Sequence, residues 1–332
     1  MRTRQVLVAF GFAIVSAACG SDDAEPPETF MEPTELLTTE LTTDLAYHPT
    51  EEPFSKDSGL VDVIAPTEGG PWPTVVVFHG NPRMAGKDWH RSDATMMAER
   101  GRVVFVPAWG DTPSPQDANE YAELSRIAAR EAQCALAFAA SNTAEFGGDP
   151  EHIAVYAYSA GANPSMMAAL AESDPLDTCL ADGPVPEVQA IVAVDADWMI
   201  GGHGDQHFME DRDAFYAKSP WRLLDGSQDI PIVIMVAEIG GPPYDRPIGA
   251  EPEQGWLSYR HADIDLLAAL EEGGYLDDGA FSLRESGEYA HQVLVDAGYD
   301  ATLVVIPGAS HESWGEPGTA VVVDNVLEAS RR

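Results

Sequence analysis

A serine at the end of a buried strand is the feature that most constrains this chain. Residues 153–158 read Ile-Ala-Val-Tyr-Ala-Tyr and continue directly into Ser159, Ala160 and Gly161. A helical pattern of apolar residues follows over 166–170. A sharp strand-to-helix turn lifts the serine hydroxyl out of the chain, and the start of the helix offers backbone N–H groups to a developing oxyanion. We therefore expect Ser159 to be a nucleophile and the N–H group of Ala160 to be an oxyanion donor.

Two further segments, one on each side of the serine, strengthen this interpretation. Upstream, the β-branched run at 74–78 predicts a strand buried on both faces, and it ends in His-Gly-Asn at 79–81. The loop that follows can present the backbone N–H of Asn81 as a second oxyanion donor. Downstream, residues 302–306 predict another buried strand that leads to His311 on a short loop. Because a serine hydroxyl needs an adjacent base to take its proton, His311 is the candidate base.

In this order, the three segments resemble an α/β-hydrolase of the bacterial esterase and lipase group, over residues 60–330. Segment 130–162 is especially similar to the branch that includes hormone-sensitive-lipase-like and feruloyl-type esterases. That branch often has His-Gly-Gly where this chain has His79, Gly80 and Asn81. The resemblance implies that His79 orients the oxyanion loop and is not a base. It also implies hydrolysis of carboxylic esters without a cofactor.

The coarse pattern alternates strand and helix, which predicts an α/β fold with a mostly parallel sheet and helices on both faces. Ligands bind such sheets beyond the carboxyl ends of the strands, where the predicted site residues gather. We expect Gly80, Tyr158 and Trp89 to line the substrate pocket. Residues 246–286 form an insertion before the last helix–strand pair and are a candidate lid or pocket wall. The expected strands lie near 60–65, 74–79, 103–107, 152–158, 190–195, 232–237 and 302–306, and the expected helices near 91–100, 117–141, 160–172, 263–271, 287–297 and 318–329.

The carboxylate that would orient His311 has several candidates. In related esterases an aspartate often follows the strand at 232–237 within about three residues, but Gly240 stands there in this chain. Asp245 could serve if the intervening Gly-Gly-Pro-Pro turn folds it back. Glu238 is the alternative, because the role requires only a carboxylate that accepts from the imidazole. Asp197, after the preceding strand, is a third candidate. We expect Asp245 to be the acid.

The N-terminus has the pattern of an export signal. A basic start and a short apolar run over residues 1–18 precede Cys19, as in bacterial lipoprotein signals. Cys19 would be lipidated, or the chain would be cleaved before a free Cys19. We expect a disordered acidic tether over 19–44 and a catalytic domain over 45–332. The protein would then be exported to the bacterial cell envelope and contact the membrane only through its anchor.

Charge and cysteine content add two expectations. The formal net charge is -37, with 55 acidic and 18 basic residues, which argues against nucleic acid and against docking on anionic lipid. Export would permit a disulfide between Cys134 and Cys179. We expect no metal, because the histidines and the aspartate over 203–207 match no tight ligand motif.

The function expected from the sequence is that of a serine carboxylesterase acting on a small-molecule or polymer ester. Ser159 would attack the ester carbonyl, and His311 would act as general base and then general acid. A peptidase or another acyl hydrolase on the same scaffold is an alternative, since one fold hosts many chemistries. A non-catalytic surface binding protein is a third reading, because the usual acid and the usual oxyanion glycine are both replaced.

Overall fold

The computed structural model of this chain describes residues 33–49, 58–80, 86–110, 118–170, 179–181, 183–196, 229–239, 283–311 and 315–331. The predicted signal at 1–18, Cys19, and residues 246–282 of the predicted insertion lie outside these residues, whereas 283–286, expected to be the end of the insertion, form the start of α7 (Leu283–Asp296). So does the helix expected at 263–271. Among the described residues, no helix combines the length and the apolarity that crossing a bilayer requires.

One eight-stranded sheet runs through the fold in the order β1-β2-β4-β3-β5-β6-β7-β8. The strands from β4 to β8 in that order are parallel, whereas β2 is antiparallel to both β1 and β4. The mostly parallel sheet expected from the sequence is therefore confirmed. The strands are β1 (Thr39–Ala46), β2 (Leu60–Pro66), β3 (Trp72–Phe78), β4 (Val103–Pro107), β5 (Gly148–Tyr158), β6 (Ala190–Val194), β7 (Ile232–Ile239) and β8 (Ala301–Ser310).

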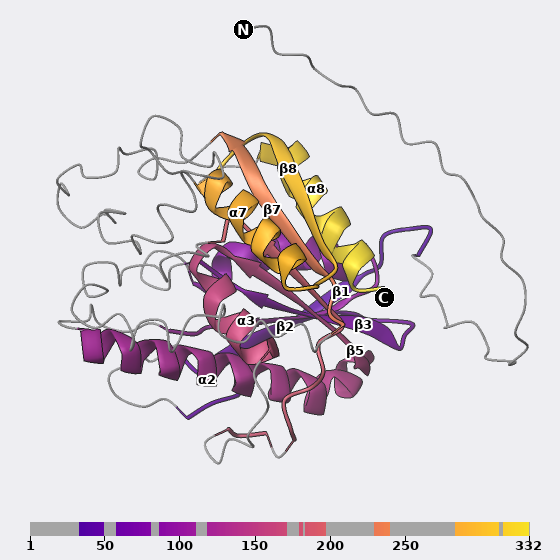
Figure 1. Cartoon of the computed structure of the whole chain (residues 1–332). Coiled ribbons are helices and arrows are strands. Elements are labelled where there is room, and N and C mark those ends of the chain that lie inside the picture. The colour runs from indigo at the N-terminus through magenta and orange to yellow at the C-terminus, as the bar shows by residue number, and fades with distance from the viewer. Residues whose placement is uncertain are drawn as a thin grey trace, which may run out of the picture.

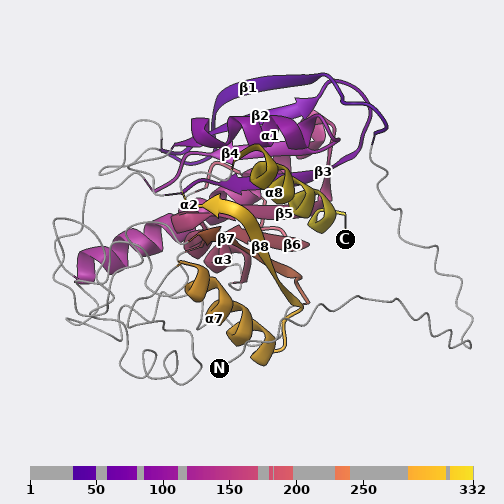
Figure 2. The ribbon, with the colours of Figure 1, turned by 90° about the horizontal axis from the view of Figure 1, so that it is seen from above.

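Helices cover both faces of this sheet. On one face, α2, α3 and α7 contribute buried side chains such as Leu136, Met166 and Leu294. On the other face, α1 and α8 contribute Met97 and Val326, and Figure 2 shows these two helices beside each other. The central strands between the two layers are apolar where both of their faces are buried, as over 153–158 of β5 and throughout β4 and β6. The helical segments are η1 (Lys87–His90), α1 (Arg91–Ala98), α2 (Ala118–Asn142), η2 (Thr143–Phe146), η3 (Ser159–Gly161), α3 (Ala162–Leu170), α7 (Leu283–Asp296) and α8 (Gly315–Ala329).

The chain order of the sheet brings distant segments to one edge. Strand β5 lies between β3 and β6, and β8 pairs with β7 at the far end of the sheet from β1 (Figure 1). Parallel strands end at the same edge, so the residues that follow β3, β5, β6 and β8 gather there. These are the positions of the predicted oxyanion loop, the predicted nucleophile and the predicted base.

Strand β1 corrects the predicted domain boundary. The tether was expected to run to residue 44, but Thr39–Ala46 forms an edge strand that pairs antiparallel with β2. The backbone of Leu37 also donates to the carbonyl of Glu99 at 2.8 Å. The acidic, threonine-rich composition suggested disorder, yet the backbone groups on one side of this segment pair with β2, so the folded domain begins before residue 45.

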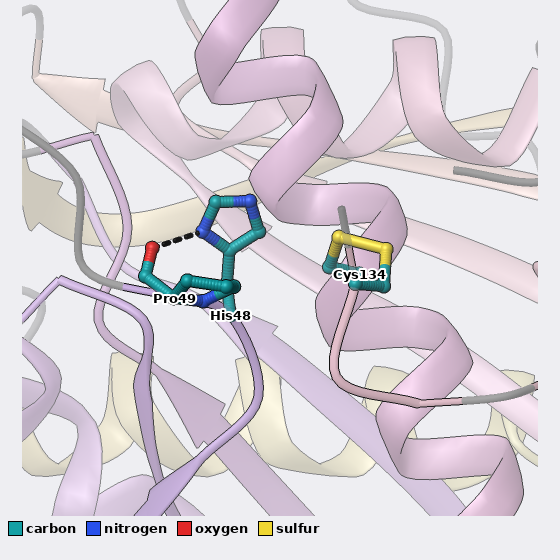
Figure 3. Close-up of a disulfide and its surroundings, with 4 residues drawn as sticks. His48, Pro49 and Cys134 are labelled. Atoms are coloured by element: carbon teal, nitrogen blue, oxygen red, sulfur yellow. Dashed lines mark hydrogen bonds between the residues drawn. A yellow bond between two sulfur atoms is a disulfide. The ribbon is translucent and has the colours of Figure 1, made fainter. Parts of the chain in front are cut away.

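Cys134 on α2 and Cys179 form a disulfide in the structure. The N–H of Leu180 donates to the carbonyl of Tyr47 at 3.3 Å, at the end of β1. Figure 3 shows the disulfide together with His48, which follows β1. The crosslink therefore ties the short segment around Cys179 to α2, next to the edge of the sheet.

Candidate active site

The turn after β5 has a strained backbone at the predicted nucleophile. Ser159 has a φ of 51°, in the left-handed region that a residue other than glycine rarely adopts. Gly161 lies against the end of β3, where a Cβ would approach the carbonyl oxygen of Phe78 to 2.6 Å and that of His79 more closely still. A larger residue would fit there only if the turn after β5 moved away from the end of β3. This explains the glycine two residues after the serine.

The turn after β8 brings His311 to this serine. The Oγ atom of Ser159 lies 3.2 Å from Nε2 of His311, within hydrogen-bond distance. Ser159 is 8% exposed, and the imidazole side chain is 15% exposed. The structure therefore joins the predicted nucleophile and the predicted base, which lie 152 residues apart in the sequence.

Asp195, directly after β6, faces the other side of the same imidazole. Its Oδ2 atom lies 3.5 Å from Nδ1 of His311. Its Oδ1 atom accepts a 2.7 Å hydrogen bond from the backbone N–H of Ala237 on β7, so the carboxylate is held in place. The carboxylate is fully buried, and the φ of 43° at Asp195 turns the chain sharply at the strand end. A separation of 3.5 Å is long for a hydrogen bond, but such contacts tighten when substrate binds and the imidazole gains charge.

None of the three predicted acids is paired with His311 among the described residues. The Oε2 atom of Glu238 accepts from the backbone N–H of Gly308, inside β8, at 2.8 Å. Asp245 and Asp197 lie outside the described residues. Asp195 was not among the acids predicted from the sequence, although it directly follows the strand, which ends at Val194. The signal that could have identified it is an acidic residue directly after a strand that ends at this edge of the sheet.

Only part of the predicted oxyanion hole lies among the described residues. Ala160, whose N–H was predicted to be a donor, follows Ser159 in the short turn η3. Gly80 packs closely on the nucleophile turn: a Cβ there would lie 3.0 Å from the ring of Tyr158 and 3.3 Å from Cβ of Ser159. Asn81 lies outside the described residues. The close approach of Gly80 places the start of the loop after β3 directly beside the serine.

His79 is buried behind that loop and is built for a structural role. Its Nδ1 lies 2.9 Å from the carbonyl of Gly80, and its Nε2 accepts from the N–H of Trp109 at 3.4 Å. The indole of Trp109 stacks on the imidazole and donates to the His79 carbonyl at 3.2 Å. Burial lowers the pKa of His79 to about 4. The hydrogen bond to Gly80 acts in the opposite direction, and the nearby His90 contributes to the lowering. A neutral imidazole that donates from Nδ1 to Gly80 fits this network.

This burial predicts a loss of stability in mild acid. The unfolded chain takes up a proton at His79 near pH 6.5, whereas the folded chain resists protonation down to a pKa of about 4. Unfolding therefore binds a proton between these values, so the free energy of unfolding falls as the pH falls. We expect wild type to lose about 3 kcal/mol more than His79→Gln between pH 7 and pH 4, measured by denaturant unfolding. Parallel pH profiles for the two proteins would contradict this assignment.

Trp89, predicted to line the pocket, lies on η1 and is 59% exposed. The segment is anchored to β2 by the buried carboxylate of Asp62. Lys87 donates to that carboxylate at 2.5 Å, and Arg91 donates to it through Nε and Nη2 at 2.9 and 2.6 Å. A buried charge is stable only when it is paired in this way. The anchored segment holds Trp89 open to solvent and His90 buried.

Tyr158, the other predicted pocket residue beside Gly80, is 7% exposed and has its side chain against His311. Within the described ranges, no group of three or more histidine, cysteine, aspartate or glutamate side chains could hold a metal ion. The sequence 203–207 lies outside those ranges.

Comparison with solved structures agrees on the fold. A truncated carbohydrate esterase from gut microbiota superposes with a TM-score of 0.55 at 15% identity, covering 90% of this chain and 99% of that one. A carboxyl esterase from the mycorrhizal fungus Tuber melanosporum gives 0.53 at 16% identity, covering 93% and 88%. A bacterial heroin esterase gives 0.54 at 16% identity, covering 89% and 85%.

This chain has the α/β-hydrolase fold. The sheet order, the helices on both faces and the superpositions agree on it. No protein-family model matches the chain, and no curated protein matches its sequence. With identities of 15% to 16% to these structures, the likeness extends to the fold alone, and the chemistry has to be argued from the side chains of this chain.

Proposed function

We propose that this protein is a serine carboxylesterase. The observation that carries the proposal is the line of three side chains at the carboxyl ends of β5, β8 and β6: Ser159 Oγ, the two ring nitrogens of His311, and Asp195 Oδ2. The order of these residues along the chain is serine, acid, histidine, as in α/β-hydrolases that use a triad.

The geometry supports a two-step acyl transfer. Nε2 of His311 takes the proton of Ser159 as Oγ attacks the ester carbonyl carbon, and the tetrahedral intermediate carries its negative charge on the former carbonyl oxygen. The N–H groups of Ala160 and Asn81 stabilise that oxyanion, each worth about 3 kcal/mol. His311 then gives the proton to the leaving alcohol. Water, activated by the same histidine, hydrolyses the acyl-enzyme and frees Ser159.

Asp195 stabilises the imidazolium that forms in each step. Its carboxylate lies on the Nδ1 side of the ring and is fixed by Ala237, so it holds the tautomer with a proton on Nδ1 and a free lone pair on Nε2. This arrangement leaves Nε2 to accept the serine proton. The acid of the triad is thus Asp195 in this proposal, in place of Asp245 or Glu238.

The named activities of the structural neighbours support ester bonds as the target. The carbohydrate esterase, the carboxyl esterase and the heroin esterase differ in substrate but all cleave esters by name. We further propose that the protein is exported and anchored through Cys19. The disulfide between Cys134 and Cys179 favours an oxidising compartment, because such bonds are rare in the cytosol.

Covalent labelling tests the proposal directly. The full chain is treated with an alkyl fluorophosphonate and digested, and the adduct is located by mass spectrometry; hydrolysis of p-nitrophenyl esters from acetate to long acyl chains is followed in parallel. We expect one adduct, on Ser159, that forms as ester hydrolysis is lost. Labelling elsewhere, or folded protein that neither labels nor hydrolyses any ester, would overturn the proposal and favour the non-catalytic binding protein. Cleavage of peptide anilides alone would favour the peptidase.

A further inference from the structure

Tyr158, the residue just before the serine, makes two contacts with His311. Its phenol donates a short hydrogen bond to the backbone carbonyl of His311. Its ring also stacks on the imidazole, with the ring centroids 5.2 Å apart and the planes 20° from parallel. One contact restrains the main chain of the histidine and the other restrains its side chain.

A buried histidine, His90, also packs against this tyrosine. The ring of His90 lies 5.4 Å from that of Tyr158, at 64° to it. His90 is 4% exposed, and its Nδ1 lies 3.3 Å from Oδ2 of Asp93 on α1. Tyr158 therefore packs against both His90 and His311, and its freedom to change rotamer is small.

The position of Tyr158 in the sheet explains why such a contact matters. The nucleophile follows β5 and the base follows β8, and β6 and β7 lie between these strands. Small shifts of β8 would therefore move His311 relative to Ser159. Tyr158 is adjacent to the serine, and its phenol reaches across this gap to His311. A hydrogen bond therefore joins the nucleophile turn to the backbone of the base.

We propose that Tyr158 is a positioning residue that holds Nε2 of His311 on Ser159. This inference rests on the proposed serine esterase mechanism. Loss of the hydroxyl releases the main chain of His311 while the stacked ring remains. A misplacement of about 1 Å between reacting groups can cost about 100-fold in rate. The effect falls on the chemical step, because Tyr158 is buried beneath the histidine and its hydroxyl is bound to protein.

Tyr156 provides a matched control. It lies two residues earlier on β5, so its side chain points to the same face of the sheet. It is fully buried and packs against the same His90, with ring centroids 5.6 Å apart. Its hydroxyl has no hydrogen-bond partner in the part of the chain that the structure describes. Burial raises its pKa well above the ordinary value, so it stays a neutral phenol. Removing this hydroxyl therefore breaks no hydrogen bond to the site.

The test compares Tyr158→Phe and Tyr156→Phe in the full chain, using steady-state hydrolysis of the best nitrophenyl ester. We expect kcat of Tyr158→Phe to fall about 10- to 100-fold with KM little changed, while Tyr156→Phe stays close to wild type in both. Equal kcat values for Tyr158→Phe and wild type would overturn the inference. So would equal losses in the two variants, because that would be the signature of a general packing defect.

A second readout does not depend on activity. In spectra of the full chain carrying ¹⁵N-labelled histidine, with His311 assigned by its absence in His311→Ala, the His311 ring signals should shift in Tyr158→Phe and stay in place in Tyr156→Phe. Unchanged His311 signals in Tyr158→Phe would overturn the inference. An inactive wild type would overturn the proposed function, and this spectral comparison would still decide whether Tyr158 positions His311.

Discussion

Ester hydrolysis is expected to fall by about a million-fold when Ser159 is replaced with alanine, which is the largest effect of any substitution in the chain. The Oγ atom is the group that attacks the ester carbonyl, and it lies 3.2 Å from the base that takes its proton. Without it, His311 has no hydroxyl proton to take and Asp195 has no imidazolium to stabilise, so only the oxyanion donors and substrate binding remain. The measurement is kcat for the best nitrophenyl ester, together with fluorophosphonate labelling of the same sample.

Ser165→Ala is the matched control for this substitution. Ser165 is another fully buried serine, on α3, and its hydroxyl donates to the carbonyl of Gly161 at 2.7 Å. Because Ser165 lies within a helix and its hydroxyl bonds to a backbone carbonyl, removing this hydroxyl should lower the stability somewhat and leave kcat close to wild type. If Ser159→Ala kept its activity while folded, the nucleophile would be a different residue. If Ser165→Ala lost as much as Ser159→Ala, the loss would reflect packing around α3 and not chemistry at Ser159.

The nucleophile and the base could be found from the sequence because each is signalled by its own neighbourhood. Ser159 follows an apolar run that is buried on both faces, and His311 directly follows β8. Such local patterns determine where a strand ends, and the parallel sheet then brings the ends together. The small residue at Gly161 is required by the carbonyl oxygens of the strand next to it, so the sequence carries that signal as well.

The acid and the first strand could not be found in the same way. Asp195 is one of 55 acidic residues, and what distinguishes it is tertiary: the bond from Ala237 on β7 and the imidazole of His311 beyond it. Glu238 lies nearer to the expected position, but the fold directs it to Gly308. Strand β1 owes its order to pairing with β2, and an exposed edge strand of threonine, leucine and acidic residues has no local pattern that separates it from a tether.

Asp195→Asn is expected to lower kcat by about ten-thousand-fold with KM little changed. An amide of the same shape keeps the hydrogen bond from Ala237 through its oxygen. The amide nitrogen can then face Nδ1 of His311, and this favours the tautomer with the proton on Nε2, which cannot accept from Ser159. The amide also lacks the charge that stabilises the imidazolium. Circular dichroism and the melting temperature would show that the fold is kept.

Glu238→Gln and Asp245→Asn complete the comparison, because each removes one rival carboxylate and retains a hydrogen-bond acceptor. Gln at 238 can still accept from Gly308, so we expect both variants to keep most of the wild-type kcat. A ten-thousand-fold loss in Asp245→Asn with an active Asp195→Asn would return the role to Asp245. Comparable partial losses in Asp195→Asn and Glu238→Gln would mean that the carboxylates share the role. A loss confined to Asp195→Asn would identify Asp195 as the acid, in keeping with its full burial, its fixed Oδ1 and an Oδ2 that faces His311.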